Sequence, residues 1–196
     1  MIHWNMLKQV KTNFKKTGLQ LLHWQNGNVL DPSNDYLLDR YVKSQTIGGE
    51  SYIVLTVYEK DHCCLALPYE PRTCLRTPIL NKDCQIAFKI SFNDAVKTKF
   101  LWLRDEADML YKDVDDVLSI EYDPDTQRIT ANGQVVYDNI EEDITYRFVL
   151  TKQGDSVIVN EIELDIKCKE DYWVSLGVLS EKGTDNSVNL HSLSIQ

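Results

Sequence analysis

Between residues 117 and 138, polar and apolar residues follow the pattern of a short antiparallel meander. From 118 to 122, leucine, isoleucine and tyrosine alternate with polar residues, as they do in a strand with one buried face. An Asp-Pro-Asp-Thr sequence at 123–126 then predicts a turn. A second turn is predicted at Asn132 and Gly133, because both residues tolerate the positive φ angles of a type I′ hairpin. The pattern therefore predicts three antiparallel strands in succession.

Strand-like stretches continue through most of the chain after position 50. Besides the meander, strands are expected at 52–58, 86–92, 100–104, 144–151, 157–167, 172–179 and 188–195. No helical crossover pattern separates them, which disfavours a parallel α/β sheet. Many short strands joined by turns are typical of sandwiches, so the sequence predicts an all-β protein with an antiparallel two-sheet β-sandwich.

Two regions give weaker signals. Apolar residues from 103 to 117 fall at helical spacing, which leaves a short helix and an irregular loop both open. Residues 1–50 contain loop-like sequences and one candidate strand near 18–24. Because no repeat or linker is evident, we expect a single β-sandwich domain over residues 1–196, with 1–50 a partly irregular segment that packs on it.

Composition narrows the function classes. The chain has 196 residues, 43% of them hydrophobic, and a net charge of −9, which fits a folded domain and disfavours a nucleic-acid-binding surface. No run approaches the ~20 apolar residues of a membrane span, and lysines interrupt the N-terminal segment where a secretory signal would be apolar. With an odd number of cysteines, five, the sequence favours reduced thiols and a cytoplasmic location. A disulfide between Cys74 and Cys84 would require an oxidising compartment.

The order of strands and turns resembles that of the concanavalin A-like (laminin-G-like) jelly roll. The resemblance rests on the hairpin from Ile120 to Tyr137, on Trp173 to Val178 and on the closing strand from Leu190 to Ile195, and it covers about residues 84–196. It implies a two-sheet, jelly-roll-type sandwich whose concave face or rim loops bind glycans or partner proteins. The resembling group also includes glycoside hydrolases.

Three alternating acids are the candidates for catalysis. Glycoside hydrolysis needs two carboxyl groups on either side of the sugar, and the resembling hydrolases carry Glu-x-Asp-x-Glu on one strand. Here Glu161, Glu163 and Asp165 alternate with apolar residues, although their order departs from that pattern. A solvated face of an amphipathic strand would give the same alternation, and this alternative is favoured.

Aromatic and cationic residues are the candidates for sugar binding. Aromatic rings stack on pyranose rings, while arginine donates hydrogen bonds to hydroxyl groups. Trp102 and Arg104 are expected on one face of a strand, with Tyr172 or Trp173 on a later strand. Burial in the core is the alternative for each aromatic residue.

Metal binding has weaker support. Oxygen ligands for calcium are available at Asp31, Asn34 and Asp35, and a second acidic segment spans 105–125. A solvated surface is the favoured alternative for that segment. The His-Cys-Cys sequence at 62–64 lacks the paired spacing of a zinc site. The sequence therefore predicts no cofactor, with calcium left open as the one alternative.

The sequence as a whole favours binding over catalysis. We expect a non-catalytic, lectin-like module that binds a glycan, with no nucleic-acid partner and no membrane span. A structural or protein-interaction module is the first alternative, and a glycoside hydrolase that uses Glu161, Glu163 and Asp165 is the second.

Overall fold

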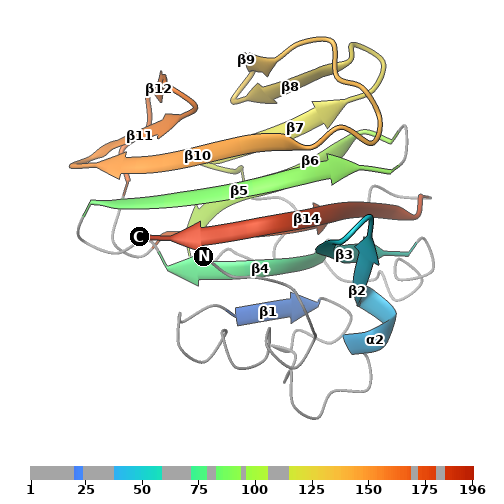
Figure 1. The fold of residues 1–196 in the computed structure, drawn as a ribbon. Helices are drawn as coiled ribbons and strands as arrows, with labels where there is room; N and C mark the ends of the chain where they lie inside the picture. The colour runs from blue at the N-terminus through green and yellow to red at the C-terminus, as the bar shows by residue number, and fades with distance from the viewer. Residues whose placement is uncertain are drawn as a thin grey trace, which may run out of the picture.

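The computed structural model describes residues 20–23, 38–58, 72–78, 83–93, 96–105, 115–168, 172–179 and 184–196. Two seven-stranded antiparallel sheets lie face to face (Figure 1). Its one described helix is the short α2 (Leu38–Tyr41), and no described helix is long and apolar enough to cross a membrane. The predicted fold class, an all-β, antiparallel two-sheet sandwich of jelly-roll type, is confirmed.

The first sheet contains the meander and three strands distant from it in sequence. In spatial order its strands are β1 (Gln20–His23), β4 (Arg72–Pro78), β13 (Tyr172–Leu179), β6 (Thr98–Asp105), β7 (Leu118–Asp123), β8 (Arg128–Ala131) and β9 (Gln134–Tyr137). Because β13 pairs with both β4 and β6, three segments that are far apart in the chain form the middle of this sheet.

The second sheet lies in front of the first in Figure 1. In spatial order its strands are β12 (Ile162–Leu164), β11 (Ser156–Val159), β10 (Tyr146–Gln153), β5 (Cys84–Phe92), β14 (Asn186–Ile195), β3 (Glu50–Val57) and β2 (Val42–Ile47). The C-terminal strand β14 sits between β5 and β3, so the end of the chain is part of the sheet centre.

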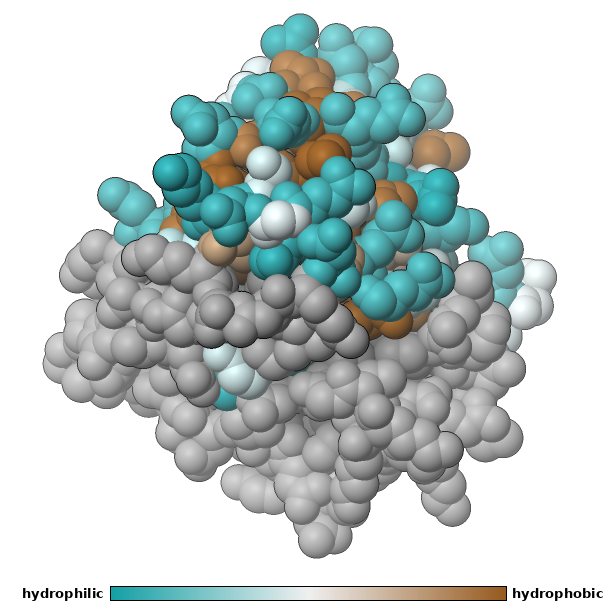
Figure 2. Space-filling view, turned by 90° about the vertical axis from the view of Figure 1, so that its left-hand side faces the viewer, coloured by the Kyte–Doolittle hydropathy of each residue, from teal (hydrophilic) through white to brown (hydrophobic). Residues whose placement is uncertain are grey.

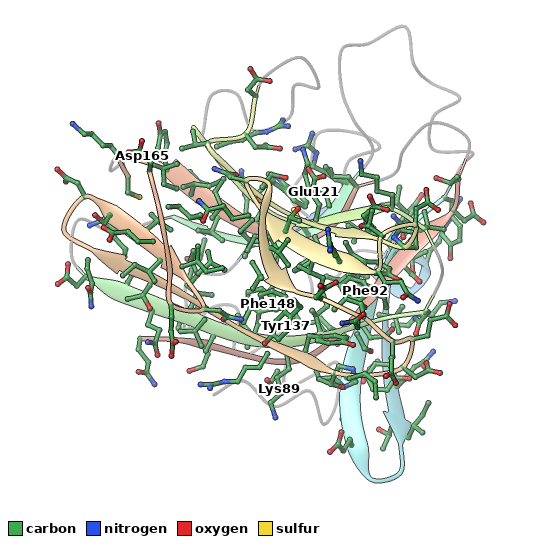
Figure 3. The ribbon with its side chains drawn as sticks, turned by 90° about the horizontal axis from the view of Figure 1, so that it is seen from above. Lys89, Phe92, Glu121, Tyr137, Phe148 and Asp165 are labelled. Carbon is green, nitrogen blue, oxygen red and sulfur yellow. The ribbon has the colours of Figure 1, made fainter. Side chains whose placement is uncertain are left out.

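Aromatic side chains fill the space between the sheets. Phe88 and Phe148 stack with ring centroids 5.1 Å apart, and Phe100 lies at 6.4 Å and 5.2 Å from them. Seen from above, Phe92 and Phe148 lie between the sheets, while Lys89 and Glu121 point away on opposite sides (Figure 3). The alternation read from the sequence therefore separates core residues from the two outer faces.

Both predicted turns of the meander are present. Asn132 and Gly133 have φ angles of 46° and 79°, as a type I′ turn requires. At the other turn the backbone N–H of Asp125 donates to the side chain of Asp123 at 3.0 Å. The Asn132 amide also bonds the backbone of Val117 and Ser119, so it ties the turn to the start of β7.

The expected strand at 157–167 is wrong. The chain reverses after Val159, and the pairing of Val159 with Ile162 leaves Asn160 and Glu161 as a two-residue turn. Their φ angles are 47° and 73°, the type I′ geometry. The reversal produces two short strands, β11 and β12. At this end of the sandwich the described surface is mostly hydrophilic, with hydrophobic residues showing between (Figure 2).

Replacing Glu161 by glycine is expected to stabilise the protein by about 1 kcal/mol, because a non-glycine residue pays a penalty in the left-handed region. The Asn132-Gly133 turn of the same protein can be compared with it directly, because glycine there occupies the turn position that Glu161 occupies here. The measurement is the midpoint of thermal unfolding. Glu161→Ala is the control, because it removes the charge but keeps the left-handed penalty. Equal stabilisation by both variants would show that the lost charge, and not the relieved backbone conformation, is the cause.

Candidate functional site

The outer face of the first sheet carries an unusual set of buried side chains. On β4, Leu75 belongs to the core between the sheets, so the residues that alternate with it point to the opposite side. These are Arg72, Cys74 and Arg76, with exposures of 0%, 0% and 8%. Arginine is rarely buried without partners, and two on one strand face therefore indicate a specialised surface.

Two tryptophans lie on the same face. Trp102 is fully buried, and the guanidinium carbon of Arg72 lies 5.6 Å from the centre of its ring system. Arg76 stacks more closely on Trp173, at 4.5 Å. Arg104 is the register partner of Trp173 and completes the group. We call these five residues the arginine–tryptophan face: Arg72, Arg76, Trp102, Arg104 and Trp173.

Gly177 permits β4 and β13 to pack closely beneath this face. A β-carbon at this position would lie 2.1 Å from the backbone oxygen of Thr73 and 2.6 Å from the β-carbon of Cys74. Real β-carbons do not approach other atoms so closely, so only glycine fits this backbone arrangement. The register places Gly177 directly opposite Cys74.

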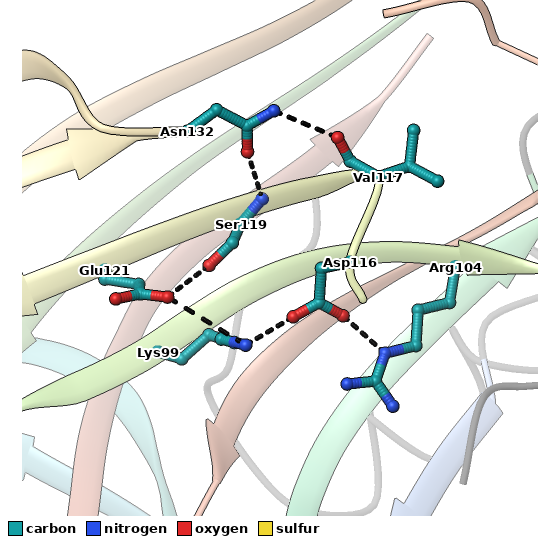
Figure 4. Close-up of polar contacts among 7 residues, drawn as sticks. All are labelled: Lys99, Arg104, Asp116, Val117, Ser119, Glu121 and Asn132. Carbon is teal, nitrogen blue, oxygen red and sulfur yellow. Dashed lines mark hydrogen bonds and ion pairs between the residues drawn. The ribbon is translucent and has the colours of Figure 1, made fainter. Parts of the chain in front are cut away.

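An ion network holds the cationic side chains at one edge of the face (Figure 4). Asp116 binds the Lys99 ammonium with one carboxylate oxygen and Arg104 Nε with the other. The side chains of Arg104 and Asp116 are only 2% and 3% exposed. Lys99 also lies 3.9 Å from Glu121, which accepts a 2.6 Å hydrogen bond from Ser119. Asp116 thus fixes two cations from β6 with one buried carboxylate.

Two buried donors on this face, from Trp102 and Ser175, lack a hydrogen-bond partner among the described residues. The indole Nε1–H of Trp102 makes no hydrogen bond to any residue that the structure describes. Ser175, opposite Trp102 in the register, makes no regular hydrogen bond within the described chain either, although its hydroxyl acts to lower the pKa of the Cys74 thiol. Burial dominates for that thiol and raises its pKa to about 11, so Cys74 stays protonated and uncharged near neutral pH.

The sequence-based candidates for ligand binding divide between two faces. Trp102, Arg104 and Trp173 share the arginine–tryptophan face, as the expected alternation on β6 required. Tyr172 is one residue earlier on β13 and points the other way, into the core, where it is 7% exposed. The sequence left Tyr172 and Trp173 open as alternatives, and strand alternation distinguishes them.

The three candidate acids do not share a strand face. Glu161 lies in the tight turn, Glu163 is on β12, and Asp165 follows the end of that strand. Glu161 lines a hollow of about 610 Å³ on the second sheet, together with Tyr137 and Arg147. Figure 3 shows Asp165 at one end of the molecule, well away from Glu121 on the first sheet.

The metal candidates are only partly described. Asp31, Asn34 and Asp35 lie outside the described residues, as do the residues at 62–64, and of the segment 105–125 only 105 and 115–125 are described. Within the described ranges no group of three or more His, Cys, Asp or Glu side chains could hold a metal ion. Cys74 and Cys84, the pair considered for a disulfide, belong to different sheets.

Sequence reasoning missed the strand that supplies most of the positive charge. β4 reads Arg-Thr-Cys-Leu-Arg-Thr-Pro, in which arginine and cysteine alternate with threonine and leucine. This period of two is a strand signal, but polar residues on both faces hide it from a hydropathy pattern. Arg72 and Arg76 were therefore not identified as site residues, and Asp116 was considered only as part of the acidic segment at 105–125.

Comparison with known proteins identifies the fold but no family. No protein-family model matches the chain, and no curated protein matches its sequence. Among solved structures, the alginate lyase A1-II′ of polysaccharide lyase family 7 superimposes with a TM-score of 0.68 at 14% identity over 95% of this chain and 97% of its own. Alginate lyase AlgAT5 of that family gives 0.68 at 12% identity over 91% and 93%. Alginate lyase AlyC3, in complex with dimannuronate, gives 0.54 at 11% identity over 91% and 88%.

These similarities confirm the concanavalin A-like jelly-roll sandwich and correct the expected function. The alginate lyases named above share this fold over 88–97% of their own length, and they are catalytic proteins that act on a polysaccharide. This finding fits neither a non-catalytic, lectin-like module nor a glycoside hydrolase, so the function expected from the sequence is wrong. At 11–14% identity the comparison establishes the fold alone, and the chemistry must be argued from the residues of this chain.

Proposed function

We propose that this protein cleaves an acidic, uronate-containing polysaccharide by β-elimination. The observation that carries the proposal is the arginine–tryptophan face, which gathers three buried guanidinium groups and two indole rings on one sheet of an alginate-lyase-like fold. Against a net charge of −9 for the whole chain, this concentration of positive charge fits an anionic ligand.

The arginines fit the electrostatic demand of that reaction. A base removes the proton on the carbon next to the carboxylate, and the C–H electrons form a carbon–carbon double bond as the neighbouring glycosidic C–O bond breaks. The departing oxygen takes up a proton, and no water is consumed. During proton removal negative charge builds on the carboxylate, where guanidinium groups stabilise it by paired hydrogen bonds. We assign this role to Arg72, Arg76 and Arg104, and assign no base among the described residues.

The tryptophans fit the sugar rings. An indole presents a flat apolar surface to the C–H groups of a pyranose, and Trp173 is partly exposed with Arg76 stacked on it. A uronate residue bound there would meet an aromatic surface and a cation together. Of the structural relatives, AlyC3 was solved with dimannuronate, which makes mannuronate polymers the first substrates to test.

The test is an assay for the unsaturated product. The purified protein is incubated with polymannuronate, polyguluronate and polygalacturonate, and with a neutral glucan, while the ultraviolet absorbance of the conjugated double bond is followed. We expect absorbance to rise with at least one acidic polymer and not with the glucan. Arg76→Ala should lower kcat/KM by about 100-fold, the usual effect of removing one charge-stabilising group.

Arg128 provides a matched control for Arg76. It lies on the same side of the first sheet, on β8, but its side chain is 49% exposed and pairs with Asp138 at 3.1 Å. Arg128→Ala is expected to leave kcat/KM unchanged. Absence of unsaturated product from every acidic polymer, with the protein folded, would refute the proposal.

A further inference from the structure

Trp102 stands out on the arginine–tryptophan face because its polar atom is buried and unsatisfied. Its side chain has 0% exposure, and the indole Nε1–H finds no acceptor among the residues that the structure describes. Most buried donors in proteins are hydrogen-bonded, since an unpaired one costs about 1–3 kcal/mol. The unpaired N–H is therefore the feature of Trp102 that packing alone does not explain.

The surroundings of Trp102 define what an acceptor there would be. The register places Trp102 opposite Ser175, which in turn lies opposite Arg76, so donors from β6, β13 and β4 line up across three neighbouring strands. Arg72 lies over the Trp102 ring at 5.6 Å. A ligand oxygen bound next to the Trp102 indole would have cationic groups and hydrogen-bond donors around it. Such surroundings favour an anionic acceptor over a neutral one.

We propose that Trp102 Nε1–H donates a hydrogen bond to a carboxylate oxygen of a uronate residue bound on the arginine–tryptophan face. This inference rests on the proposed function and adds a specificity-determining residue to it. Arginine supplies charge, and the fixed indole N–H supplies direction, because a rigid ring can donate along one line only. Since Trp102 is fully buried, an oligosaccharide reaches it only through local opening of the structure.

The indole signal of Trp102 tests this directly. The chain has four tryptophans and therefore four indole N–H resonances, and Trp102→Phe identifies the one of interest. Uniformly ¹⁵N-labelled protein is titrated with a mannuronate oligosaccharide, and separately with a neutral manno-oligosaccharide of equal length. We expect the Trp102 indole resonance to shift saturably with the acidic oligosaccharide alone. Trp102→Phe should weaken its binding by about tenfold, as the loss of one hydrogen bond to a charged group does.

The outcomes separate this inference from the proposed function. If the oligomannuronate binds, as seen from other resonances, while the Trp102 indole does not move, the inference is overturned, and any lyase activity still stands. If the indole shifts but no unsaturated product forms, the inference holds and the lyase proposal fails. If no acidic oligosaccharide binds, the inference is also overturned. The shift is measured in the unsubstituted protein, so the test does not depend on whether Trp102→Phe folds.

Discussion

Replacing Asp116 by asparagine is expected to lower the free energy of unfolding by about 3–5 kcal/mol. Asp116 bridges Lys99 and Arg104, and the side chains of Asp116 and Arg104 are almost completely buried. Asparagine preserves the shape of the side chain but removes the charge, so a buried guanidinium loses its counter-charge where water cannot replace it. Denaturant-induced unfolding, followed by circular dichroism, gives the change in free energy.

The Arg128–Asp138 pair is the internal control for this prediction. Its two side chains are 49% and 50% exposed, and it lies at the far edge of the same sheet. The pKa of Asp138 is lowered by its hydrogen bond from Arg128, so its small contribution is present above the normal carboxyl pKa and is lost as the pH falls. Solvent screens such a pair, and Asp138→Asn should change stability far less. Similar losses from both variants would show that burial of the Asp116 network has no energetic consequence.

The meander was predictable because its determinants are local. Each of its turns is specified by residues adjacent in the sequence, such as Asn132 and Gly133, and the strands between alternate with a clear period. The split at Asn160 and Glu161 was not predictable in the same way. Glutamate is a poor residue for the left-handed position, and pairing of Val159 with Ile162 overrides that preference.

The candidate site was less accessible to sequence reasoning because tertiary pairing assembles it. Arg76, Ser175 and Trp102 are neighbours across three strands, yet they are distant in the chain and no local pattern links them. Trp102 and Arg104 could be placed on one face because they lie two residues apart on one strand. Whether that face is the core or the exterior depends on the whole topology, which the sequence alone does not specify.

Replacing Gly177 by alanine is expected to destabilise the protein by about 3 kcal/mol or more. The added β-carbon would lie 2.1 Å from the carbonyl oxygen of Thr73, and it would also collide with the backbone of Cys74. These atoms belong to β4, whose position is held by pairing with both β13 and β1, so the clash cannot be relieved by rotating a side chain. The strands must separate, and Arg72 and Arg76 move with β4. The loss is measured by denaturant unfolding.

Gly133→Ala separates this steric effect from the conformational cost of replacing a glycine. Gly133 has a φ of +79° but no atom within 4 Å of its would-be β-carbon, so alanine there incurs only the left-handed penalty of about 1 kcal/mol. Gly177 is the reverse case, with a crowded site and no positive φ. If the two variants lose the same stability, the close approach of β4 and β13 is not what requires glycine. If Gly177→Ala alone loses much more, the close packing of the two strands under the arginine–tryptophan face depends on the missing side chain.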